Sequence, residues 1–274
     1  MELQTLKDYA FIRTQLSAVE RSDENTVSGF LNVCDDNILK LITLSAASLC
    51  SASVELFKDG ESKTTKKISE ADFVAKYGEC SIKVNLSTQK VHSKFPIFES
   101  WNDLLSYHDS VLTPVEGVYI NSEQELYCEG VESTKFQRYK NASKLCQLIK
   151  YVSNEKTSDN EYLIIFGQSL AIKFNIDESA LENDIDPDSL DELLSKDLHK
   201  EAKKSLVREA LINFLNNHDV QYRLTYLLQH FNAFSTQLLS SYEQYVSNYS
   251  FDKVRKEYQE KKTEYAARIN KVFD

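Results

Sequence analysis

The sequence predicts an α+β protein: a mixed domain with an antiparallel sheet over residues 1–176, then a helical region over residues 177–274 that ends in a long helix. Up to Ile176, short stretches of alternating apolar and polar residues come in pairs, as half-buried strands do. Beyond Ile176 the apolar residues recur at intervals of three and four, the spacing of a helix face. With only six glycines and three prolines no linker marks the boundary, so we place it near Asp177, where the spacing changes.

Three hairpins are expected in the first domain. Asp59 and Gly60 lie between the first pair of arms, and these residue types accept the positive φ of a tight hairpin turn. Gly167 and Gln168 lie between the last pair. The paired arms are residues 52–57 with 64–68, 117–121 with 125–129, and 162–166 with 170–176.

Helices are expected around these hairpins. Residues 3–19 have apolar side chains at helical spacing, whereas the periodicity of residues 36–50 assigns neither helix nor strand. Ser100, three residues before Asp103, predicts a helix start close to a capping box. Residues 134–152 carry an apolar face that suits a helix packed on a sheet.

The helical region begins with Asp186 and Pro187, a strong N-cap followed by a proline in the first turn, where its missing N–H is harmless. Further helices are expected at residues 190–198, at 202–215 and from 220 onward. Oxygen-bearing residues recur from Asp184 to Glu192 as in a calcium loop, but Ser189 stands where that loop needs glycine. Helix capping therefore explains the acidic cluster better.

An apolar stripe along the last helix predicts a contact surface, because such a seam is normally covered by a partner. A protein partner or a second copy of the chain could cover it; for the tyrosines of this region, packing against the chain's own domain is the more common arrangement. The residues assigned to this surface are Leu228, Phe231, Leu238, Tyr242, Tyr245, Tyr249, Tyr258, Tyr265 and Ile269.

Composition narrows the functional classes. A formal net charge of −10 and a pI near 5.1 argue against general nucleic-acid binding, which needs a basic surface. Five cysteines without metal-ligand spacing indicate reduced thiols in a cytoplasmic protein. No run approaches the roughly 18 apolar residues that span a bilayer, so membrane contact is expected only if the native chain continues past residue 274.

The sequence shows no catalytic, cofactor-binding or metal-binding motif, and glycine-rich phosphate loops are missing. We therefore assign no catalytic residue, cofactor or metal ligand, and a non-enzymatic role is favoured. The alternative is a metal-dependent hydrolase or nuclease whose carboxylates converge only in the fold. Its candidate ligands are Asp35, Asp36, Asp59, Glu61 and Glu79.

Basic residues gather on the expected helix over residues 134–152, with no acidic residue among them. Lys135, Arg138, Lys140 and Lys144 could bind an anionic ligand such as a nucleotide or a lipid headgroup. They could equally complement the acidic residues 177–192 of the same chain. The second interpretation needs no ligand and is favoured.

In the second half of the chain, the order of the apolar residues resembles that in the soluble part of uncharacterised bacterial membrane-anchored proteins, which are found in phage-defence gene neighbourhoods. The resemblance rests on Phe136, Tyr139, Leu145, Leu148 and Ile149, on residues 162–167, and on Tyr265, Ile269, Val272 and Phe273. It implies a cytoplasmic protein, which would be tethered at the inner face of a membrane if a hydrophobic membrane segment followed the long helix. The function expected is a non-catalytic sensing or assembly module in antiphage defence, which couples a cytosolic cue to a partner, an oligomer or a membrane segment.

Overall fold

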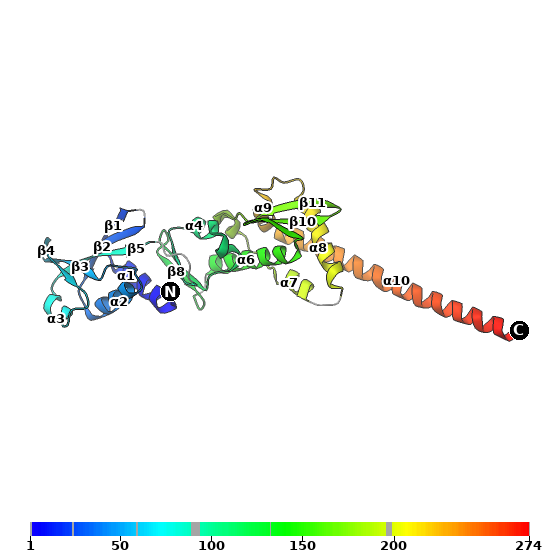
Figure 1. The fold of residues 1–274 in the computed structure, drawn as a ribbon, viewed down its shortest axis with the longest axis horizontal. Helices are drawn as coiled ribbons and strands as arrows, with labels where there is room; N and C mark the ends of the chain where they lie inside the picture. Colours follow the sequence, from blue (N-terminus) through cyan, green and yellow to red (C-terminus); the bar gives the residue numbers. More distant parts are fainter. Residues whose placement is uncertain are drawn as a thin grey trace. The chain divides into compact units, whose positions relative to one another are not determined.

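The computed structural model describes residues 2–23, 25–58, 60–88, 94–131, 133–195 and 199–273. These residues form helices and mainly antiparallel sheets, which confirms the α+β prediction (Figure 1). The chain divides into two compact units: unit 1 comprises residues 1–143 and 176–182, and unit 2 comprises residues 144–175 and 183–274. This division differs from a single boundary near Asp177, because the last hairpin packs on the helices of unit 2 while residues 176–182 return to unit 1.

Unit 1 contains a five-stranded sheet in the order β1-β2-β5-β3-β4, with every neighbouring pair antiparallel. Helices α1 and α2 cover one face of this sheet (Figure 1). The bounds are α1 (Leu3–Gln15), β1 (Ser17–Asp23), β2 (Thr26–Asn32), α2 (Asp35–Ala46), β3 (Ser53–Lys58), β4 (Glu61–Lys67), α3 (Phe73–Tyr77) and β5 (Ser81–Ser87).

Buried and non-buried side chains alternate along β3 and β5 of the five-stranded sheet, and the buried ones form part of the hydrophobic core between the sheet and its helices. In β5, Ile82, Val84 and Leu86 are at most 1% exposed, and the residues between them are not buried. Their side chains join those of Tyr9 from α1 and Leu41 from α2 in one hydrophobic cluster. Burying such side chains contributes roughly 1.5–3 kcal/mol each.

The rest of unit 1 is a small sheet in the order β6-β7-β8, together with short helices. A capping box at Ser100 and Asp103 starts α4, as expected. Helix α6 begins at Thr134 and ends at Val152, the predicted range, and its first half belongs to unit 1. The bounds are β6 (Ile97–Phe98), α4 (Trp101–Ser106), α5 (His108–Leu112), β7 (Gly117–Ile120), β8 (Glu125–Cys128) and the 3₁₀ helix η1 (Glu178–Glu182).

Unit 2 packs a three-stranded sheet, β11-β10-β9, against helices. Arg223 fixes one of these contacts, because its Nη1 donates to the Ala171 carbonyl of β11 at 2.6 Å. Arg208 of α8 similarly donates to the Val152 carbonyl at the end of α6. The bounds are β9 (Glu155–Ser158), β10 (Glu161–Phe166), β11 (Gln168–Lys173), α7 (Asp188–Ser195), α8 (Lys200–Leu215), α9 (Arg223–Gln229) and α10 (Phe231–Phe273).

Two helix expectations need correction. The first helix ends at Gln15 rather than near residue 19, because the chain then enters the edge strand β1. The long final helix begins at Phe231, since the chain breaks at His230 after α9. The His230 carbonyl accepts hydrogen bonds from Ala233 and Phe234 and so starts the new helix. Leu228 therefore belongs to α9 and lies outside the final helix.

Candidate functional site

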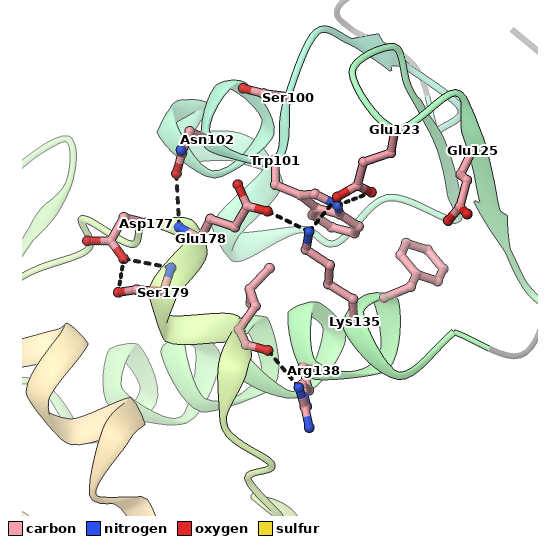
Figure 2. Close-up of polar contacts among 12 residues, drawn as sticks. Ser100, Trp101, Asn102, Glu123, Glu125, Lys135, Arg138, Asp177, Glu178 and Ser179 are labelled. Atoms are coloured by element: carbon pink, nitrogen blue, oxygen red, sulfur yellow. Dashed lines mark hydrogen bonds and ion pairs between the residues drawn. The ribbon is translucent and has the colours of Figure 1, made fainter.

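A charged and aromatic cluster in unit 1 surrounds the first turn of α6; we call it the Lys135 cluster (Figure 2). Lys135 Nζ donates to Glu123 Oε1 and Glu178 Oε1, both at 2.5 Å, and lies 5.3 Å from the centroid of the Trp101 ring. Trp101 Nε1 and the Tyr127 hydroxyl donate to the second oxygen of Glu123, at 2.9 and 2.5 Å. The cluster is defined by Trp101, Glu123, Tyr127, Lys135 and Glu178. The cluster thus joins α4, β8, α6 and η1, which are separate in the sequence of unit 1, around the side chain of Lys135.

The contacts shift the pKa values of Glu123, Tyr127 and Lys135. Partial burial alone would raise the pKa of Glu123, but hydrogen bonds from Lys135, Tyr127 and Trp101 outweigh it and hold that pKa below its usual range. Partial burial would lower the pKa of Lys135, but its two carboxylate partners raise it. Burial, followed by the carboxylates of Glu123 and Glu125, raises the pKa of Tyr127. The cluster therefore keeps an ionised carboxylate and ammonium pair and a neutral phenol at pH 7.

We expect unit 1 to lose stability as the pH falls below about 4.5, the region in which glutamate titrates in the unfolded chain. A carboxyl group whose pKa is lower in the folded state stabilises that state above its unfolded pKa, and this contribution disappears as the pH falls through the folded pKa. The loss at pH 3 should be smaller in Glu123→Gln than in the unsubstituted chain. Urea unfolding at pH 7 and pH 3 measures the loss of stability in both proteins. If both lost the same free energy of unfolding, Glu123 would not be the source of the pH dependence.

The second turn of α6 holds residues 176–182 in place. Arg138 Nη1 donates to the Leu181 carbonyl at 3.2 Å, and the Glu178 N–H donates to Asn102 Oδ1 at 2.9 Å (Figure 2). An open pocket of about 500 Å³ lies here, lined by Lys135, Arg138, Glu178 and their neighbours. The cationic groups in its wall already contact the chain's own carboxylate and carbonyl oxygens.

The remaining basic residues predicted to bind an anion also have contacts within the chain. Lys144 Nζ lies 2.7 Å from carboxylate oxygens of both Asp188 and Asp191, within unit 2. Lys140 Nζ lies 4.7 Å from the centroid of the Phe136 ring. The favoured interpretation of the basic helix, complementing acidic residues 177–192, therefore agrees with the contacts of Lys135 and Lys144. Anion binding through these four residues would need a ligand that displaces internal partners.

The structure does not gather the acidic residues of the alternative nuclease hypothesis into a metal-binding group within its described residues. Asp36 pairs with Lys40 at the start of α2, and Glu79 pairs with Lys58 at 3.0 Å. Asp35 lies beside Asp36, Glu61 starts β4, and Asp59 lies outside the described residues. Within the described ranges, no three histidine, cysteine, aspartate or glutamate side chains are grouped so that they could hold a metal ion.

The acidic segment before α7 caps a helix. Asp186 Oδ1 accepts a hydrogen bond from the Asp188 N–H at 3.0 Å. The capping interpretation of this segment is thus supported, and Asp188 and Asp191 face Lys144 as described.

The residues predicted for a partner surface fall into three groups. Leu228, Phe231 and Leu238 are at most 2% exposed, so the prediction of an open contact surface is wrong for these three, which form part of the core of unit 2. Tyr242 and Tyr245 are half-buried, and Tyr245 contacts His199 at the start of α8. Outward-facing positions follow further along α10, where Tyr249 is 48% and Tyr258 is 70% exposed. The backbone of Tyr265 and Ile269 is helical, and their side chains lie outside the described set.

Comparison with protein-family models, curated proteins and solved structures finds no match for this chain. Across the described residues, no helix is long and apolar enough to cross a bilayer. Sequence reasoning identified Lys135 and named the acidic range 177–192, which includes Glu178, as the complement of its helix, but it missed Trp101, Glu123 and Tyr127. The members of the Lys135 cluster are spread over 78 positions of the chain, so no local spacing could have associated them.

Proposed function

We propose that this chain is a non-catalytic assembly module, in which the outer part of α10 binds a second copy of the same helix. The observation that supports the proposal is the change in burial along α10. The helix is 43 residues long, about 64 Å at 1.5 Å per residue, and its first two turns are anchored in unit 2 while its described outer turns are open to solvent.

Burial decreases steadily along the helix. Phe231, Phe234 and Leu238 are buried, Tyr242 and Tyr245 are half-buried, and all residues of the range 255–264 are exposed. In Figure 1 the outer part of α10 runs on past the other elements of unit 2. A helix in water without a packed face gains little stability from propensity alone, so coverage by a partner would stabilise these turns.

Apolar residues recur in the outer part of α10 with the seven-residue period of coiled-coil helices. Phe251, Tyr258, Tyr265 and Val272 recur at seven-residue intervals, the period of a coiled-coil seam. If they occupy the a positions, Glu257 falls at g and Lys262 at the following e. In a parallel pair these two positions face each other across the seam, and here their charges are opposite. A parallel second copy therefore suits the pattern.

The same register places Lys261 at a d position, where a charged side chain weakens the seam. We expect a reversible dimer of two 31.5 kDa chains, with Tyr258→Lys shifting it to the monomer. Lys261→Leu should tighten association at least tenfold, because each copy then buries an apolar side chain worth roughly 1.5–3 kcal/mol. Sedimentation equilibrium over a range of concentrations measures both effects.

The matched control is Lys256→Leu, which adds the same side chain at an exposed f position away from the seam. It should leave the dimer constant unchanged. A chain that stays monomeric at about 100 µM, a concentration far above a micromolar Kd, would refute the proposal. Equal tightening by both leucine variants would mean nonspecific association and would also refute it.

A further inference from the structure

The path of the chain between the two units has an unusual feature, which we call the strap. Residues 176–182 belong to unit 1, whereas the residues before and after them, up to Asn175 and from Asn183, belong to unit 2. The strap is seven residues long and contains η1. It is thus a short piece of one unit inserted into the chain of the other.

The strap is fixed to unit 1 by both apolar and polar contacts. Ala180 and Leu181 are 3% and 2% exposed, so their side chains are buried. On the polar side, Glu178 is held twice: its carboxylate by Lys135 and its N–H by Asn102. Arg138 holds the Leu181 carbonyl. Two polar contacts therefore converge on the single residue Glu178, whose side chain is 41% exposed and open to water.

The ends of the strap continue directly into structural elements of unit 2. Strand β11 ends at Lys173, three residues before the first residue of the strap, and α7 begins at Asp188, six residues after its last. Both elements pack against α8, the helix that also packs against α10. A movement of the strap would be transmitted along the chain to β11 and α7, and both of these elements support α8.

We propose that the strap is a latch: its attachment through Glu178 to Lys135 and Asn102 stabilises α8 in unit 2, and its release loosens the helix on which α10 is anchored. The contacts inside unit 1 then control the stability of a helix of unit 2 through chain connectivity. This role does not depend on self-association of α10.

Hydrogen exchange of the full chain, read by mass spectrometry, tests the latch. Glu178→Gln weakens the contact with Lys135, and Asn102→Ala removes the other contact, so the two variants release the same residue by independent routes. Each variant should speed exchange in residues 176–182 about fivefold, because losing one such contact shifts an opening equilibrium by about that factor. Exchange in α8 should speed at least twofold. Glu182→Gln is the matched control, since it removes an exposed carboxylate of the same strap.

Faster exchange in both the strap and α8 for Glu178→Gln and Asn102→Ala, with neither change in Glu182→Gln, supports the latch. Faster exchange in the strap with unchanged α8 overturns it, because release would then stay local. Unchanged exchange of the strap in both variants overturns it as well. The same acceleration of α8 in Glu182→Gln would show a general charge effect and would equally reject the proposal.

Discussion

Trp101→Ala should lower the free energy of unfolding of unit 1 by about 4 kcal/mol, the usual loss when a large buried aromatic side chain is truncated. Trp101 is 1% exposed, and its ring centroid lies 5.1 Å from that of Tyr127 and 6.1 Å from that of Tyr139. Truncation leaves a cavity between these rings and removes the N–H that donates to Glu123. Urea unfolding followed by circular dichroism measures the loss.

A second substitution separates packing from hydrogen bonding. Trp101→Phe keeps most of the ring and removes the N–H, so it should cost about 1–3 kcal/mol, mainly from the donor that Glu123 loses. If the two variants were equally unstable, the hydrogen bond would dominate and the packing account of Trp101 would be wrong. If both were neutral, the Lys135 cluster would contribute little to unit 1.

Phe234→Ala should destabilise unit 2 by about 3–5 kcal/mol and loosen the base of α10. Phe234 is 1% exposed, and its ring meets that of Phe214 on α8 edge to face, with the centroids 5.6 Å apart. The two units can be followed separately, because the only tryptophan of the chain lies in unit 1. Helical circular dichroism should therefore melt earlier in this variant, while the transition seen by tryptophan fluorescence stays in place.

Leu239→Ala is the control on the same helix. Leu239 is 41% exposed, so its truncation should change stability by no more than about 0.5 kcal/mol. A large effect of this exposed residue, or a neutral Phe234→Ala, would contradict the assignment of the buried and open faces of α10.

Local sequence signals anticipated much of the fold. The range of α6, the capping box at Ser100 and the hairpin that turns at Gly167 with φ +67° were all predicted, because each depends on residues within a few positions of one another. The run at residues 36–50 could not be assigned from its own periodicity. Residues 36–46 lie in the helix α2, buried on the side that faces the sheet, and Cys50 forms an isolated β-bridge with Leu86. Tertiary packing decided what the pattern left open.

The site and the unit boundary were less predictable, for a related reason. Lys135 stood out because cations cluster on α6, and charge complementarity indicated the acidic range 177–192 but not the particular residue Glu178, which is 43 residues away. Glu123, Trp101 and Tyr127 had no sequence signal that linked them to Lys135. The stripe beginning at Leu228 was visible, yet sequence spacing cannot tell whether an apolar face is covered by its own chain or by another. The structure shows that the first part of the stripe packs inside unit 2, and that the helix on either side of His230 is interrupted.

The return of residues 176–182 has a consequence for how this protein can be divided or recombined. The chain passes between units after Ser143, after Asn175 and after Glu182, so no single cut separates one unit from the other. A gene fragment that stops at Ser143 would encode unit 1 with the sites for Ala180 and Leu181 open to water, and the complementary fragment would carry those two apolar side chains without their cover. Exchange of either unit between genes would therefore have to transfer two separate stretches of coding sequence together.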